Sequence, residues 1–151
     1  MRDRRLKEKM AMNSSSTTVS AELGLRLVVP DSATVPLLAC LEYAADDPYA
    51  IRMAFYVGND DPVEWIFARE LLTVGIVRQV GDGDVQVWPM SQQNEHALNI
   101  ALSSPFGNAL FEVPLLPLAD FLHRTYEIVA AGRESEFIDM ETELDDLLWP
   151  S

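Results

Sequence analysis

A chain of 151 residues with 48% hydrophobic residues is long enough for one globular domain and too apolar to be disordered as a whole. Its net charge of −13 is unevenly placed, because residues 1–16 carry five basic and two acidic side chains (+3) and the rest therefore carries −16. Nucleic acid and anionic lipid are bound by cations that neutralise phosphates, so this charge argues against both partners. It favours protein partners, or serves solubility alone.

The absence of a long apolar stretch, the N-terminal composition and the single cysteine indicate where the protein acts and exclude a disulfide. No apolar stretch approaches the roughly 20 residues that span a bilayer, and the charged, then serine-rich N-terminus lacks the apolar region of a secretory signal. We expect a cytoplasmic protein without membrane insertion, with residues 1–16 as a disordered tail and 17–151 as a single domain; Met12 could itself be the start. The single Cys40 excludes an internal disulfide, and its apolar neighbours favour a buried, unreactive thiol.

The first half of the domain has an apolar period of two, which is typical of half-buried strands. A long strand is expected over 19–29, where one parity holds Val19, Ala21, Leu23, Leu25, Leu27 and Val29. Further strands are expected near 37–43, over 50–57 and around 63–67. Turns rich in proline and aspartate, at 46–48 and 58–62, separate them. Residues 68–72 favour a single helical turn.

The second half begins with a hairpin and ends in helices. Gly81-Asp82-Gly83-Asp84 predicts a turn between strands at 76–80 and 85–88, and strands follow at 96–102 and 109–113. The apolar period then becomes helical, on a face formed by Leu118, Phe121, Leu122, Thr125 and Val129. Pro117 introduces this helix and Gly132 closes it. A second helix is expected from Asp139, with its acidic side chains in solvent.

These elements predict an α+β fold with seven or eight antiparallel strands followed by two helices. Several strands have one apolar and one mixed face. One side of the sheet should therefore pack on a helix, and the other should be wet or meet another subunit.

The sequence offers no assembled set of catalytic or metal-binding residues. His96 and His123 stand alone in separate elements, so a structural or surface role is favoured for both. The turn at 81–84 lacks the ligand offsets of a calcium loop, and the serines at 103–104 have no nearby histidine base. We therefore expect no enzyme activity and no cofactor. An enzyme or ligand carrier would reveal itself by a deep pocket with converging polar groups.

Other features bear on packing and on partners. Trp88 ends a strand before Pro89 and is either core or an anchor at a protein interface, where tryptophan is enriched. The seven acids between Glu134 and Asp146 are either a solvated helix face or a docking element. Trp65 shares its parity with apolar neighbours and is expected in the core.

Several strings, in fixed order and spacing, carry a resemblance to a known family. They lie at residues 17–20 with 25–29, 47–50, 65–72, 81–89, 102–105 and 121–125. Each string is weak alone, and their combination is specific. On these strings the chain resembles the SsgA-like proteins of actinomycetes, from about Thr17 to Leu148.

The resemblance implies a fold similar to whirly-type proteins, with curved antiparallel sheets and C-terminal helices, assembled as a homotrimer. It implies a non-enzymatic role in sporulation-linked cell division, in which FtsZ, the tubulin-like division GTPase, is recruited to future septa together with an SsgA-type partner protein. The whirly likeness also raises an alternative, single-stranded nucleic-acid binding, which rests on fold alone. Such binding needs a basic groove, whereas Arg26, Arg52 and Arg78 are scattered along the strands.

The residues expected to bind partners are Asp47, Tyr49, Trp88, Phe106, Glu141 and Asp145. The string Asp47-Pro48-Tyr49 fits a rigid turn, and Arg69 is expected to pair with a nearby acid such as Asp47. Phe106 stands where an acidic residue is common in the family, and Gln86 where a basic one is common. Both positions therefore depart from the family's pattern of partner contacts.

Overall fold

Alternating apolar residues build the strands that the sequence predicts. The computed structural model describes residues 17–58, 61–92 and 95–138. Its first four strands are β1 (Thr18–Val28), β2 (Thr34–Ala44), β3 (Ala50–Tyr56) and β4 (Val63–Ala68), and a 3₁₀ turn, η1 (Pro30–Ser32), joins β1 to β2. The helix α2 (Arg69–Gly75) follows, then β5 (Val80–Asp82), β6 (Val85–Gln92), β7 (Glu95–Ser104), β8 (Gly107–Pro114) and the helix α3 (Leu115–Ile128).

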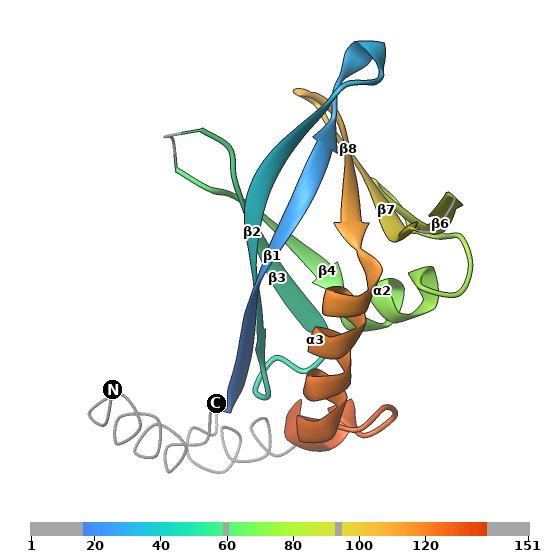
Figure 1. The fold of residues 1–151 in the computed structure, drawn as a ribbon. Helices are drawn as coiled ribbons and strands as arrows, with labels where there is room; N and C mark the ends of the chain where they lie inside the picture. The colour runs from blue at the N-terminus through green and yellow to red at the C-terminus, as the bar shows by residue number, and fades with distance from the viewer. Residues whose placement is uncertain (1–16, 59–60, 93–94, 139–151) are drawn as a thin grey trace, which may run out of the picture.

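Within the described residues the strands form one antiparallel sheet in the order β4-β3-β2-β1-β8-β7-β6-β5 (Figure 1). β1 pairs with β2 along its full length, from Thr18 opposite Ala44 to Val28 opposite Thr34. With β8, by contrast, β1 pairs only through residues 26–28. The predicted α+β fold, with seven or eight antiparallel strands before C-terminal helices, is confirmed, and the described strands form one sheet of eight.

The sheet curls strongly about its inner face. Phe55 in β3 and Phe111 in β8 are separated by two intervening strands, which in a flat sheet would place them about 14 Å apart. Their rings nevertheless stack, with centroids 4.4 Å apart. The inward side chains converge because the strands bend around them, and the buried Leu25, Leu41 and Val87 lie on this same inner face.

The helix α3 covers the inner face at one end of the sheet, against β1, β7 and β8 (Figure 1). The predicted apolar face is confirmed, because the buried residues are Leu118, Phe121, Leu122, Thr125 and Val129. The helix begins at Leu115, before the predicted Pro117, with Pro114 as its N-cap. A proline in the first helical turn sacrifices no intrahelical hydrogen bond, so Pro117 is compatible with this earlier start.

The strand predicted over 76–80 is wrong. The helix α2 extends through Gly75, with Ile76 as its C-cap, so the strand before the hairpin is only Val80–Asp82. Gly75 allows the helix to approach β6 closely, since a Cβ at this position would lie 2.2 Å from a methyl carbon of Val87. The helix thus continues beyond the single turn predicted at 68–72, and residues 76–78 form turns and a bend where a strand was predicted.

The predicted hairpin between β5 and β6 is confirmed. Asp82 pairs with Val85 across it, and Gly83 has φ +62°, a conformation that favours glycine. The second helix predicted from Asp139 lies outside the described residues, but residues 134–138, directly before it, are helical. In the described part of the chain, no helix has the length and apolarity needed to cross a membrane.

A buried charge joins the sheet to the C-terminal helix. Arg69, the first residue of α2, is 1% exposed. Its Nη1 donates to the carbonyl oxygens of Thr125 at 3.2 Å and Val129 at 2.8 Å, at the end of α3. The carbonyl end of a helix carries partial negative charge and lacks intrahelical donors. Arg69 therefore supplies both the charge and the hydrogen bonds that this terminus needs.

Two tyrosine rings and a carboxylate complete the surroundings of Arg69. Its Nη2 donates to Oε2 of Glu134 at 2.9 Å, and the Glu134 side chain is 16% exposed. Its guanidinium carbon lies 3.9 Å from the centroid of the Tyr126 ring and 5.0 Å from that of Tyr43, both within the range of cation–π attraction. The predicted pairing of Arg69 with Asp47 is wrong, because the chain beyond α3 brings Glu134 back to the guanidinium.

The same cluster shifts the protonation of two groups. Burial raises the pKa of Tyr43 to about 12, against an opposing effect of Arg69. The Tyr43 hydroxyl therefore stays protonated, and it donates to the Pro48 carbonyl oxygen at 3.0 Å. The pKa of Glu134 is lowered, mainly by the hydrogen bond from its own backbone N–H and further by Arg69, while burial opposes the shift.

We expect substitution of the buried Arg69 to reduce the free energy of unfolding much more than substitution of an exposed arginine. Arg69→Ala leaves a cavity and leaves the Val129 carbonyl oxygen without its donor, whereas the Thr125 carbonyl oxygen keeps the Val129 N–H at 3.0 Å. We expect a loss of about 3 kcal/mol or more in the free energy of unfolding. Arg124→Ala removes the exposed pair with Asp120 and a guanidinium carbon 5.9 Å from the centroid of the Phe121 ring, and we expect a loss below about 1 kcal/mol. Urea unfolding followed by circular dichroism measures both; equal losses would contradict the role assigned to Arg69.

The lowered pKa of Glu134 predicts a pH dependence of stability. A carboxyl whose folded-state pKa is depressed contributes stability above its ordinary value of 4.5 and loses it as the pH falls through the folded-state pKa. The stability difference between wild type and Glu134→Gln should therefore be present at neutral pH and shrink as the pH falls below 4.5. Urea unfolding across this range measures it, and a constant difference would contradict the assignment.

Candidate functional site

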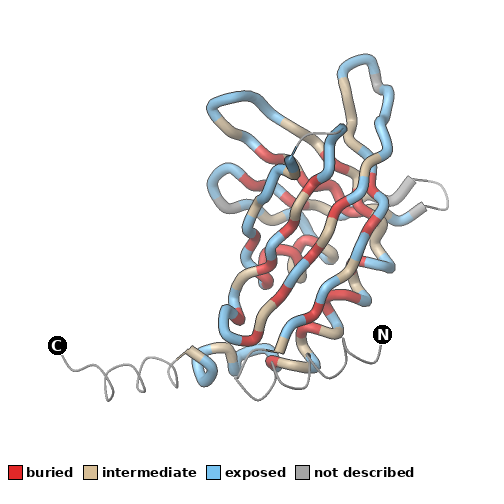
Figure 2. Tube along the Cα trace, turned by 90° about the vertical axis from the view of Figure 1, so that its left-hand side faces the viewer, coloured by how far each residue is buried: buried red, intermediate tan, exposed pale blue. Residues whose placement is uncertain are grey.

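The inner apolar face of the sheet extends beyond the helices that cover it. Along β4, the inward residues change from buried Phe67 through half-buried Trp65 to Val63, which is 51% exposed. β2 shows the same gradient, from buried Leu41 toward exposed Val35. Figure 2 shows the buried positions gathered in the body of the sheet and exposed positions along the loops at its far end. The apolar period thus continues where α3 no longer provides cover, and we call this the open end.

An apolar groove of about 290 Å³ occupies the inner face at the open end. The stacked Phe55 and Phe111 belong to its lining, which draws on β1, β3, β4 and the β7–β8 hairpin. Its lining residues, none of them charged, are Leu27, Phe55, Val57, Val63, Trp65, Leu102, Ser104, Phe106, Gly107, Asn108, Ala109 and Phe111. A groove of this composition can bind apolar side chains, and it offers no group for acid–base chemistry.

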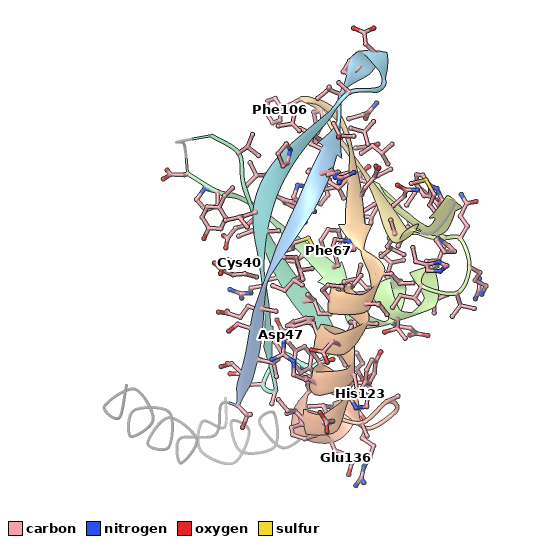
Figure 3. All side chains as sticks on the ribbon, in the orientation of Figure 1. Cys40, Asp47, Phe67, Phe106, His123 and Glu136 are labelled. Carbon is pink, nitrogen blue, oxygen red and sulfur yellow. The ribbon has the colours of Figure 1, made fainter. Side chains whose placement is uncertain are left out.

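Phe106 stands at the rim of this groove, on the turn between β7 and β8 (Figure 3). Ser104 fixes the turn, because its Oγ accepts a hydrogen bond from the Phe106 N–H at 3.2 Å and donates to the Gly107 carbonyl oxygen at 3.3 Å. Gly107 has φ +141°, which a side chain would disfavour. The Phe106 side chain is 98% exposed. A rigid turn thus holds a large apolar ring in solvent.

The edge strand β4 borders the groove and carries exposed apolar residues on both faces. Val63 points to the inner face, and Ile66, 61% exposed, points to the outer face. Leu38 and Tyr56 lie opposite each other on the neighbouring strands β2 and β3, and both are exposed on that outer face. Among the described residues, no strand pairs with the far side of β4.

The outer face also holds the cysteine. Cys40 is half-buried, and its Sγ lies 3.9 Å from Oε2 of Glu22. The neighbouring thiol raises the pKa of Tyr56, with burial as a further cause. The expectation of a buried thiol is wrong, because Cys40 alternates with Ala39 and Leu41, which take the inner positions.

The other residues predicted to bind partners do not gather at the groove. Asp47 and Tyr49 are exposed in the turn between β2 and β3, at the covered end of the sheet near α3 (Figure 3). Trp88 is half-buried on β6, opposite Asn99 of β7. Glu141 and Asp145 lie outside the described residues. Phe106 is thus the one predicted residue that the structure places at the open end.

Sequence reasoning missed the edge of the sheet. The period of two assigned Trp65 to the core together with its strand, and the structure leaves it half-buried beside the groove. Ile66 gave a signal, since an apolar residue on the solvent parity of a strand needs some other cover. The number of inward-facing apolar residues was a second signal. Two short helices cannot cover the inward residues along the full length of eight strands.

The remaining ionisable groups do not assemble into a reactive site. His96 and His123 are both exposed, as the sequence predicts. Within residues 17–58, 61–92 and 95–138, no group of three or more histidine, cysteine or acidic side chains is placed to hold a metal ion. A second cavity, of about 420 Å³, opens where β1 diverges from β8 and is lined by Arg26, His96 and Glu112. Its lining contains one carboxylate and neither a hydroxyl nor a thiol nucleophile.

Comparison with known sequences places this geometry in context. The family described as Streptomyces sporulation and cell division protein, SsgA, matches residues 37–134. The chain is 60% identical, over 137 residues, to the sporulation-specific cell division protein SsgB of Thermobifida fusca, covering 91% of this chain and 99% of that protein. It is 46% identical to SsgB of Streptomyces coelicolor, covering 88% of this chain and 97% of that protein.

A solved structure agrees with these matches. The crystal structure of an SsgA-like sporulation-specific cell division protein from Thermobifida fusca superimposes with a TM-score of 0.83 at 60% sequence identity. The alignment covers 87% of this chain and 96% of that one. The curled sheet and its helical cover are therefore shared with a protein of known structure.

The exposure of Phe106 predicts that it contributes little to folding. Phe106→Ala should change the free energy of unfolding by less than about 0.5 kcal/mol, because the ring makes few contacts. Phe67→Ala, which empties a buried inner position of β4, should cost about 3–5 kcal/mol. Thermal and urea unfolding of both variants provide the measurement. A large loss for Phe106→Ala would mean that another part of the chain covers the ring.

Proposed function

This chain belongs to the SsgA family of sporulation and cell division proteins, and we propose that it recruits or positions the FtsZ ring at sporulation septa through protein–protein contacts. Its relatives are named as sporulation-specific cell division proteins, which supports a role in sporulation septation. The contact with FtsZ is the step that we add to this role.

The observation that carries the proposal is the uncovered apolar end of the sheet. A monomer seldom leaves an inward-facing apolar row open to solvent unless another molecule covers it. The groove and the Phe106 ring together offer an apolar anchor site of the kind found at the centre of protein interfaces. Because the family consists of cell division proteins, we infer that this surface binds another protein of the division machinery.

We propose that the protein acts without catalysis. The groove has no charged lining residue, and the chemistry that the family name implies is assembly rather than turnover. The alternative of single-stranded nucleic-acid binding has no support, because the groove contains no cation to neutralise phosphates and Arg69 is buried against Glu134.

The remaining parts of the proposal concern assembly and place. An SsgA-type protein is the proposed second partner, and a homotrimer the proposed state in solution. The proposed site of action is the cytoplasmic side of the division septum. The net charge of the residues after position 16 is −16. This negative charge favours contacts with proteins over contacts with anionic lipid.

Co-sedimentation with FtsZ polymers tests the proposal. We expect the purified full chain to sediment with FtsZ assembled in GTP and to remain in the supernatant without it. A chain truncated before Asp139 should retain this binding, because the open end lies within the described residues. Loss of binding in the truncated chain would instead assign the contact to the segment that holds Glu141 and Asp145.

A localisation experiment in a sporulating host provides the control in cells. A fluorescent fusion of FtsZ should appear at sporulation septa in cells that contain the full chain, and depletion of the chain should disperse it. Septal FtsZ rings that persist after depletion of the chain would contradict recruitment of FtsZ by this protein. Failure to sediment with FtsZ polymers at low ionic strength would overturn the proposal as a whole.

A further inference from the structure

The edge of the sheet at β4 has the features of a strand that is built to be paired. In an antiparallel edge strand, every second residue directs its N–H and C=O away from the sheet. β4 is six residues long, contains no proline or lysine, and has exposed Val63 and Ile66 on its two faces. Proteins usually protect such an edge by charge, by a bulge or by covering it. Among the described residues, nothing covers this one.

The groove lies directly beside this edge. Val63 and Trp65 of β4 form one of its sides, and the β7–β8 turn with Phe106 forms another. A strand added outside β4 would lie about 4.8 Å from it, with alternate side chains pointing to the same inner face as Val63. Those side chains would enter the groove, while main-chain hydrogen bonds form along the edge.

The charges around the edge define the partner. Residues 61–70 contain the acids Asp61, Glu64 and Glu70, and their single cation, Arg69, is buried against Glu134. The accessible charge of this segment is therefore wholly negative. Cationic side chains on an incoming strand would be attracted, and acidic ones would be repelled.

We propose that the free edge of β4 and the adjoining groove form one docking site for an extended segment of a partner protein, in which apolar residues alternate with lysine or arginine. The segment adds to the sheet as a further strand, its apolar residues fill the groove beside Phe106, and its cations meet the acids Asp61, Glu64 and Glu70. Main-chain bonds supply affinity and the groove supplies selectivity. This inference rests on the proposed function, since it assigns the surface through which the protein holds a partner.

A second copy of this chain is a poorer occupant than a basic segment. The only other edge of the sheet among the described residues is β5, which has three residues and ends in Asp82. Pairing β4 with β5 would leave half of β4 unmatched, and pairing it with another β4 would bring the Glu64 side chains of the two copies toward each other. Like charges at the edge thus oppose self-association while leaving the site open to a cationic strand.

Synthetic peptides of about eight residues, matched to a strand of this length, test the proposal. The first alternates valine or isoleucine with lysine or arginine. The second has the same sequence but is N-methylated at every second residue, which keeps the charge and blocks strand pairing. The third carries glutamate in place of the cations. Fluorescence anisotropy with the full chain measures binding of each peptide.

We expect the first peptide to bind, the second to bind at least about tenfold more weakly, and the third not to bind. Val63→Lys and Glu64→Lys should each weaken the first peptide at least about tenfold, because both place a cation at the edge. Leu116→Lys is the matched control, since Leu116 is 78% exposed on α3 and distant from the edge. Circular dichroism checks that all three variants are folded.

Several results would overturn the proposal. These are equal binding of the first and second peptides, binding that survives in Val63→Lys, and equal weakening by Leu116→Lys. Binding that appears only after removal of residues 1–11 would also overturn it, because the chain's own basic segment would then be the occupant.

Sedimentation of the same variants with FtsZ separates this inference from the proposed function. If wild type and Val63→Lys sediment equally with FtsZ, recruitment survives and the β4 docking site is refuted as its contact. If wild type does not sediment with FtsZ but binds the first peptide through β4, recruitment fails and the docking site is supported.

Discussion

The structure depends on one buried cation that holds the C-terminal helix against the sheet. Arg69 joins the end of β4 to the end of α3, and it is fully buried between two tyrosine rings. A buried guanidinium is costly unless each part of it has a partner. Here the helix end supplies carbonyl oxygens to Nη1, Glu134 supplies a carboxylate to Nη2 and the rings supply π-faces, while Nε has no hydrogen-bond partner among the described residues. These contacts fix where α3 lies, and therefore which part of the inner face it covers.

That position determines the difference between the two ends of the sheet. At the covered end, α3 buries the inner residues and the Arg69 cluster excludes water. At the open end, the same strands continue with the same apolar period, but no helix reaches them, and Val63 and Phe106 are left in solvent. The covered end stabilises the fold, and the open end exposes the surface that we propose binds a partner. Substitutions at the open end can therefore change partner binding with little effect on stability.

The sequence was sufficient for features that depend on local pattern. The strands other than that predicted over 76–80, the β5–β6 hairpin and the apolar face of α3 were predictable because period and turn chemistry are local properties. The partner of Arg69 was not, since Glu134 is 65 residues away and approaches only when α3 folds back. Parity also showed which way Trp65 points but not how far the helices extend above it. The open end is a consequence of tertiary geometry, and only the exposed parity of Ile66 hinted at it.

The acidity of the domain gains a meaning from this arrangement. An exposed apolar groove beside an unprotected strand edge would usually cause self-association. The acids around β4 oppose that outcome, because any two copies that meet through this edge bring negative charges together. The same charges attract a cationic segment electrostatically. One set of acidic side chains therefore opposes self-association at this surface and favours a cationic partner. The net charge thus complements the apolar groove in this proposal. The groove provides the apolar contacts of the bound segment, and the surrounding acids favour cationic partners over acidic ones.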